Sequence, residues 1–177
     1  NIIYAVLFST MTMLISLILA SLLNQLTKFR KLFRTLFFLP YISSMVSVAV
    51  IWKMIFNPAG GPLNTILQQI GAANPPQWLA STKWALFAVI IVSVWKSCGY
   101  YMVIFLAGLQ NIPDSLYESA ALDGASSLKR YFKITLPMIT PSIFLNMVLV
   151  TINSFQVFDL VNVMTEGGPG MSTNVLS

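Results

Sequence analysis

Charged and titratable side chains are scarce in this sequence of 177 residues. Only 8% of the residues are charged, against about 25% in ordinary soluble domains, so the chain lacks the polar surface that such a domain needs. The sequence has no histidine, and its single cysteine, Cys98, has no second cysteine with which to form an internal disulfide. These absences exclude a catalytic Ser/His or Cys/His dyad. With no Cys pair and no acidic cluster, they also leave no residues suited to a structural metal site.

Hydrophobic residues make up 56% of the chain, and the mean hydropathy is +0.78. A helix needs roughly 20 apolar residues to cross the hydrocarbon core of a bilayer. Four stretches meet this requirement, at about residues 2–23, 36–56, 84–109 and 137–158. We therefore predict an all-α fold, a polytopic transmembrane helical bundle that forms a single domain over residues 1–177.

The cations are spread unevenly between the loops. Loop 24–35 has four and loop 110–133 has three, whereas loop 57–83 has one, Lys83. The cations lie beside apolar segments, so the net charge of +5 indicates membrane orientation rather than nucleic-acid binding. The excess of cations places loops 24–35 and 110–133 in the cytoplasm. The chain starts within an apolar run, without an initiator Met or a basic leader, so we expect it to be a piece of a longer polypeptide with a further span at each end.

The loop between the second and third spans carries a helical pattern. Four apolar residues follow the spacing i, i+3, i+4 and i+7: Leu63, Ile66, Leu67 and Ile70. Pro62 suits a first helical turn and Gly71 suits a C-terminal cap. The pattern predicts a short amphipathic helix, which either lies on the outer membrane face or packs on the chain's own spans.

A polar segment, ESAALDGASSLKRYFKITLP at residues 118–137, separates the third and fourth spans. Pro113 and Asp114 favour a helix start, and Gly124 then ends the helix because glycine readily adopts the turn conformation. Ser126 and Ser127 can cap a second short helix. Two short helices that meet at a glycine are either an ordinary connector or a docking surface for a cytoplasmic partner.

The segment also resembles a known motif. Glu118-Ser119-Ala120, three residues, Gly124, nine residues and Ile134-Thr135-Leu136-Pro137 match the EAA motif of binding-protein-dependent ABC transporter permeases, except that Ser119 replaces the usual Ala. The resemblance extends to IWKMIFNPAGGPLN, QWLAS, WKSCGYYMVIFLAGLQNIPDSLYESAALDGA and FDLVNVMTEGGPGMST, which are similar to the maltose, lactose, multiple-sugar and glycerol-phosphate branch. Members of this family typically have six core spans, so the four spans here correspond to the second to fifth.

The resemblance implies a permease subunit of a type I ABC importer in the cytoplasmic membrane, which is not itself an enzyme. It implies four kinds of partner besides membrane lipid: a second permease subunit, two ATPase subunits, an extracytoplasmic solute-binding protein and a sugar-like solute. ATP and Mg would be bound by the ATPase chains, and this chain would hold no cofactor. The loop over residues 110–136 would couple the ATPase to the membrane through Glu118, Ser119, Ala120, Asp123, Gly124, Ile134, Leu136 and Pro137.

Polar side chains within the spans are candidates for the solute path. They are Lys96, Tyr100, Asn146, Asn153 and Gln156. Amides in membrane helices face protein or water rather than lipid, and a charge at mid-span costs roughly 2.5–3.5 kcal/mol on insertion scales. Each candidate also has a structural interpretation: hydrogen bonding between helices for the amides, packing for the tyrosine, and snorkelling or helix pairing for the lysine.

Three other functions fit the sequence less well than an ABC permease. An ion-coupled secondary transporter often carries a buried Asp or Glu, and no span interior here has one. A membrane-embedded enzyme is disfavoured by the lack of histidine and of acid pairs within the spans. A simple membrane anchor would not need four spans with embedded polar groups.

Overall fold

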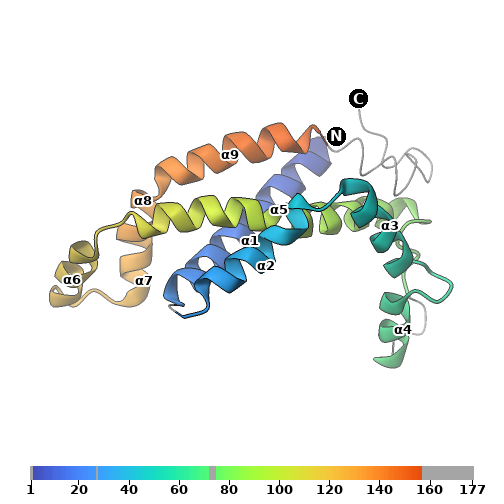
Figure 1. Cartoon of the computed structure of the whole chain (residues 1–177), viewed down its shortest axis with the longest axis horizontal. Helices are drawn as coiled ribbons and strands as arrows, with labels where there is room; N and C mark the ends of the chain where they lie inside the picture. Colours follow the sequence, from blue (N-terminus) through green and yellow to red (C-terminus); the bar gives the residue numbers. More distant parts are fainter. Residues whose placement is uncertain (1, 27, 72–74, 157–177) are drawn as a thin grey trace.

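The computed structural model describes residues 2–26, 28–71 and 75–156. These residues are all-α, with no strand among them, as predicted (Figure 1). The elements are α1 (Ile2–Gln25), α2 (Arg30–Ile42), α3 (Met45–Ile55), α4 (Pro62–Gln69), α5 (Thr82–Gln110), α6 (Asp114–Leu122), α7 (Ser127–Arg130), the π-helix η1 (Tyr131–Thr135), α8 (Leu136–Met138) and α9 (Thr140–Ser154).

Helix α5 is the central element, and α1, α2 and α9 lie along it (Figure 1). In its most apolar stretch 72% of the residues are buried, whereas the corresponding share in α1 is 22%. Both helices are long and apolar enough to cross a membrane, and there are up to four spans if each of two bent helix pairs counts as one. The exposed apolar surface of α1 is therefore available to lipid or to further helices.

Small and hydroxylated residues let α1 approach α5 closely. The buried stripe of α1 contains Thr12, Ser16 and Ala20, each four residues from the next and so on one helical face. Ser16 Oγ donates a hydrogen bond of 2.9 Å to the carbonyl of Cys98. In lipid the hydrophobic effect does not drive helices together. Small side chains at the contact instead let the helices associate through close van der Waals packing.

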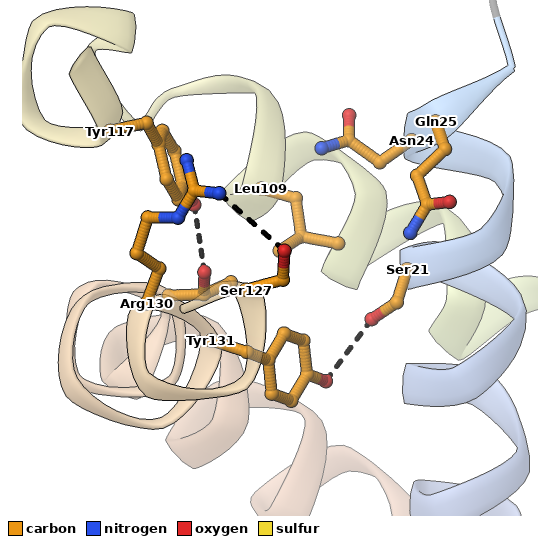
Figure 2. Close-up of a pocket in the computed structure, with 9 residues that line it drawn as sticks. Ser21, Asn24, Gln25, Leu109, Tyr117, Ser127, Arg130 and Tyr131 are labelled. Carbon is orange, nitrogen blue, oxygen red and sulfur yellow. Dashed lines mark hydrogen bonds between the residues drawn. The ribbon is translucent and has the colours of Figure 1, made fainter. Parts of the chain in front are cut away.

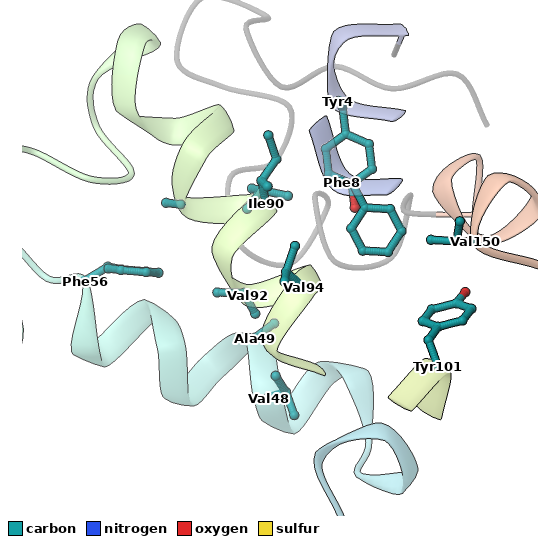
Figure 3. Packing of buried hydrophobic residues seen from close by; sticks show 12 residues of the cluster. Tyr4, Phe8, Val48, Ala49, Phe56, Ile90, Val92, Val94, Tyr101 and Val150 are labelled. Atoms are coloured by element: carbon teal, nitrogen blue, oxygen red, sulfur yellow. The ribbon is translucent and has the colours of Figure 1, made fainter. Parts of the chain in front are cut away.

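Two clusters of buried apolar residues lie along the bundle. The first surrounds the N-terminal half of α5, the half that packs near α3. It includes Tyr4, Phe8, Val48, Ala49, Phe56, Ile90, Val92, Val94, Tyr101 and Val150 (Figure 3). The second lies toward α6 and consists of Ala20, Leu23, Met102, Phe105, Leu106, Leu109, Ile112 and Ile139. Because α5 contributes to both clusters, it joins the two ends of the molecule mechanically.

Two of the expected spans are bent rather than straight. Residues 36–56 are divided between α2 and α3, which meet at 95°. The break follows Pro40, which has no N–H, and Ser43 adopts an extended backbone conformation. The segment 127–138 and α9 meet at 64°, just before Pro141 in the first turn of α9. Residues 157–158 of the fourth expected span and the resembling segment 158–173 lie outside the described residues.

The short helix predicted between the second and third spans is confirmed as α4, and Gly71 follows it with a φ of 99°. Leu63 packs against the first cluster, while Ile66 and Ile70 are exposed. Trp78 Nε1 donates a 2.8 Å hydrogen bond to Asn64 Oδ1 and so ties α4 to the segment before α5. One side of the helix therefore packs on the chain, as one of the two expected placements requires, and the other side is exposed; placement on the outer membrane face stays a prediction.

Candidate coupling loop and solute path

Helix α6 ends in a glycine turn of the expected kind. Gly124 has a φ of 72°, and its N–H bonds to the carbonyl of Ala121 at 3.0 Å. The N–H of Ala125 bonds to the carbonyl of Ala120 at 2.9 Å, which completes a Schellman motif. The prediction of a turn at Gly124 is therefore confirmed, and the physical reason is the positive φ that a side chain would strain.

The second short helix begins at the expected cap. Ser126 Oγ accepts a hydrogen bond of 3.4 Å from the N–H of Lys129, and α7 follows directly. Helices α6 and α7 project together from one end of the molecule, opposite to α4 (Figure 1). Glu118, Ser119 and Asp123 are exposed there. Two large apolar side chains are also exposed, Leu122 at 90% and Leu128 at 72%.

The last part of the motif forms a π-helix that leads into α8 and α9, the fourth candidate span. In η1 the N–H of Leu136 bonds to the carbonyl of Tyr131, five residues earlier. The following residue, Pro137, has no N–H to continue the ladder. Ile134 is half-buried, Leu136 packs against the second cluster, and Pro137 is exposed. The motif residues thus divide between an exposed elbow at 118–124 and a packed junction at 134–137.

Hydrogen bonds hold this loop to the bundle, as Figure 2 shows. Tyr131 and Ser21 face each other with their oxygens 3.1 Å apart, which connects η1 to α1. Tyr117 OH and Thr135 Oγ1 are 2.8 Å apart and connect α6 to η1. These four side chains line a cavity of about 370 Å³, together with Asn24 and Gln25 at the end of α1. Neither pair was predictable from local sequence patterns, because the partners are 110 residues apart in the first and 18 in the second.

Two of the predicted path residues meet on one tyrosine. Asn146 Nδ2 donates to the carbonyl of Tyr101 at 3.2 Å, and Asn153 Nδ2 donates to the Tyr101 hydroxyl at 3.2 Å. Asn146 is fully buried, and its Oδ1 has no partner among the described residues. Gln156 is exposed beyond the end of α9. Both amides therefore join α9 to α5, and Asn153 is the less buried of the two.

The other two path candidates lie against α2. The Tyr100 ring stacks on the Tyr41 ring with centroids 4.5 Å apart. Lys96 Nζ donates to three carbonyls at the break between α2 and α3, those of Pro40 at 3.0 Å, Tyr41 at 2.9 Å and Ser43 at 2.7 Å. A hydrogen bond to a charged group contributes about 1.5–3 kcal/mol, so three of them offset the cost of a membrane-embedded charge.

Three comparisons relate the chain to known proteins. The family model described as "Binding-protein-dependent transport system inner membrane component" matches residues 12–176. The probable ABC transporter permease protein YurN of Bacillus subtilis is 39% identical over 180 residues, which cover 100% of this chain and 62% of YurN. The trehalose/maltose transport system permease protein MalF of Thermococcus litoralis is 37% identical over 164 residues, which cover 93% of this chain and 55% of that protein.

A solved structure shares the arrangement of helices. It is a bacterial alginate ABC transporter in complex with an alginate pentasaccharide-bound periplasmic protein, and one of its chains matches with a TM-score of 0.81 at 27% identity. The match covers 96% of this chain and 60% of that chain. The chain described here thus spans about three-fifths of its relatives' length, between 55% and 62%. Since the family model matches nearly all of its residues, this chain belongs to the family of binding-protein-dependent transport system inner membrane components.

Proposed function

We propose that the chain is part of a permease subunit of an ATP-driven ABC importer, and that α6 and α7 are its docking surface for an ATPase subunit. The observation that carries the proposal is the exposed elbow around Gly124 at one end of a membrane bundle. Leu122 and Leu128 are exposed on it. Burying a leucine against a partner contributes about 1.5–3 kcal/mol, so a protein partner would stabilise this surface.

The contacts of the loop support a role in carrying motion. A partner that moves the elbow also moves η1, because Tyr117 joins α6 to Thr135. The displacement reaches α1 through the contact between Tyr131 and Ser21. Packed helices shift as rigid bodies rather than deforming continuously. ATP and Mg²⁺ would be bound by the ATPase chains, and the energy of hydrolysis would reach the membrane through these contacts.

The solute is proposed to be a sugar or a sugar derivative. Relatives named for trehalose/maltose and for alginate support this class. Asn146, Asn153 and Tyr101 place amide and hydroxyl groups between α5 and α9, and such groups can exchange their mutual hydrogen bonds for sugar hydroxyls. Tyr100, Lys96 and Gln156 remain further candidates. A second permease subunit would complete the path, and an extracytoplasmic binding protein would deliver the solute.

Reconstitution tests the proposal directly. The full protein that carries this chain is purified with its co-encoded subunits and placed in proteoliposomes. We expect uptake of a labelled saccharide that requires both internal ATP and the binding protein. Uptake that runs on an ion gradient without ATP would contradict the proposal and favour the ion-coupled alternative. Failure of the ATPase subunit to co-purify with the full protein would contradict the docking role of α6 and α7.

A further inference from the structure

The break between α2 and α3 removes the helical hydrogen-bond donors of three backbone carbonyls, and among the described residues only the carbonyl of Pro40 keeps a backbone donor, the N–H of Ser43 at 3.3 Å. In a continuous helix the carbonyls of Pro40, Tyr41 and Ser43 would accept from the N–H groups four residues later. The 95° bend separates those partners. Carbonyls that lose their partners at membrane depth must be satisfied elsewhere, because lipid offers no hydrogen bonds.

Lys96 supplies the missing donors from the neighbouring helix. An ammonium group has three donors and no acceptor, and its contacts with the three carbonyls, at 2.7–3.0 Å, match its whole capacity. Its side chain is 8% exposed. Freed carbonyls at broken membrane helices are known as ligands for bound cations. Here a side chain occupies the place of such a cation.

The same face of α5 fixes α2 at a second point. Gly99, one turn after Lys96, lies so close to α2 that an added Cβ would overlap the backbone of Phe37. Next to it, Tyr100 stacks on Tyr41, whose carbonyl is one of the three that Lys96 binds. The position of the tyrosine pair therefore depends on the geometry of the break.

We propose that Lys96 is a positioning residue, a built-in cation that holds α2 and α3 at their angle and thereby sets the Tyr41–Tyr100 pair. The proposal does not rest on the transport function. It concerns the conformation of the break, which is measured without solute or ATP. It predicts that a small ammonium ion replaces the lysine when the side chain is removed, since the three carbonyls then form an ammonium site.

The first experiment measures the angle of the break. Spin labels are attached at Arg34→Cys and Met54→Cys, exposed positions on α2 and α3, in the full protein with Cys98→Ala and in nanodiscs. Lys96→Met keeps the length of the side chain and removes the ammonium. The matched control is Lys53→Met, which removes an exposed charge from α3.

We expect Lys96→Met to broaden and shift the label distances, while Lys53→Met keeps the parent distribution. Each hydrogen bond to the ammonium is worth roughly a factor of ten or more in the equilibrium. The bent conformer should accordingly fall from the main population to a minor one. A parent-like distribution in Lys96→Met would overturn the proposal.

The second experiment restores the cation. Lys96→Ala is measured with propylammonium, which matches the removed atoms, and with tetramethylammonium, which has the same charge but no N–H donor. We expect propylammonium alone to restore the parent distances and to raise the Tm of Lys96→Ala but not of the parent. Equal effects of the two ions, or none, would overturn the proposal. If Lys96→Met does not fold, the test is whether Lys96→Ala folds. Folding of Lys96→Ala in propylammonium but not in tetramethylammonium would support the proposal, and failure to fold in propylammonium would overturn it.

Discussion

The hydroxyl oxygen of Tyr131 lies 3.1 Å from Oγ of Ser21, and this contact joins the loop after α6 to the end of α1. Both side chains are partly buried and line the cavity at the end of α1 (Figure 2). The contact bridges two elements that are far apart in the sequence, so it can transmit a displacement of the elbow to a membrane span.

Loss of this contact should weaken the connection between the loop and α1. Tyr131→Phe and Ser21→Ala each remove a hydrogen bond worth about 0.5–1.5 kcal/mol, and each should lower the Tm and the ratio of uptake to ATP hydrolysis. The double variant should cost no more than either single one, because the two share one interaction. The measurement is a double-mutant cycle on Tm and uptake in proteoliposomes. Fully additive effects would show that the two hydroxyls act independently.

Close approach of α5 to its neighbours predicts unequal effects of two glycine substitutions. In Gly99→Ala the new Cβ meets the backbone of Phe37, which has no room to move, so we expect destabilisation of about 1–3 kcal/mol. In Gly108→Ala it meets the Ser142 side chain: the hydroxyl can rotate away, the Cβ at 3.0 Å must shift only slightly, and the gain in helix propensity offsets part of the cost. Thermal unfolding in detergent should therefore give a clearly lower Tm for Gly99→Ala. An equal or lower Tm for Gly108→Ala would contradict this packing argument.

The elements that the sequence predicted best are those with a local cause. Gly124 and Gly71 end helices because glycine adopts positive φ at little cost, and both have it here. Ser126 caps α7 through a hydrogen bond to Lys129, three residues on. Turn residues, caps and apolar spacing act within a few residues, so they are visible in the sequence alone.

The elements that the sequence did not reveal depend on distant partners. The break near Ser43 has a local sign, Pro40, but its freed carbonyls are satisfied by a lysine more than fifty residues away. Tyr101 is another case, because the two amides that it binds come from α9. Sequence spacing predicts which residues share a helical face, but not which helix that face meets.

The distribution of cations predicts the orientation of the chain in the membrane. In a Cys98→Ala background, Ser127→Cys lies at the α6–α7 end and Gln68→Cys on α4, and both positions are exposed. The excess of Lys and Arg in the loops 24–35 and 110–133 predicts that a membrane-impermeant thiol reagent reaches residue 127 only from the cytoplasmic side and residue 68 only from outside. Labelling in right-side-out and inverted vesicles checks this. The reverse pattern would contradict both the orientation and the docking surface.

Asn153 offers a test of the solute path. Its amide bonds to the Tyr101 hydroxyl, and it is less buried than Asn146. We expect Asn153→Leu to alter the KM for solute, or the preference among saccharides, while leaving complex assembly intact. Tyr101→Phe is the matched control, because it removes the same hydrogen bond and keeps the amide. If the two variants behave alike and change only the Tm, the amide serves to join α5 to α9.

The elbow at Gly124 makes the sharpest prediction, because strain and charge can be separated there. Its φ is 72°, and nothing lies within 4 Å of an added Cβ, so a side chain meets backbone strain but no steric clash. Asn and Asp tolerate this conformation better than other residues, whereas Ala should cost roughly 1–2 kcal/mol. Gly124→Asn therefore adds a side chain with little strain. Gly124→Asp adds a side chain of similar size that also carries a negative charge beside Asp123.

If the elbow docks on an ATPase, the charge should matter more than the side chain. We expect Gly124→Asn to keep most of the uptake, and Gly124→Asp to weaken ATPase recruitment or to leave it docked but uncoupled. Membrane insertion should survive in both, since the spans lie outside this loop. The measurements are co-purification of the ATPase, solute-stimulated ATP hydrolysis and uptake in proteoliposomes. Full recruitment, stimulation and uptake in Gly124→Asp would show that the loop is only a connector between α5 and α9.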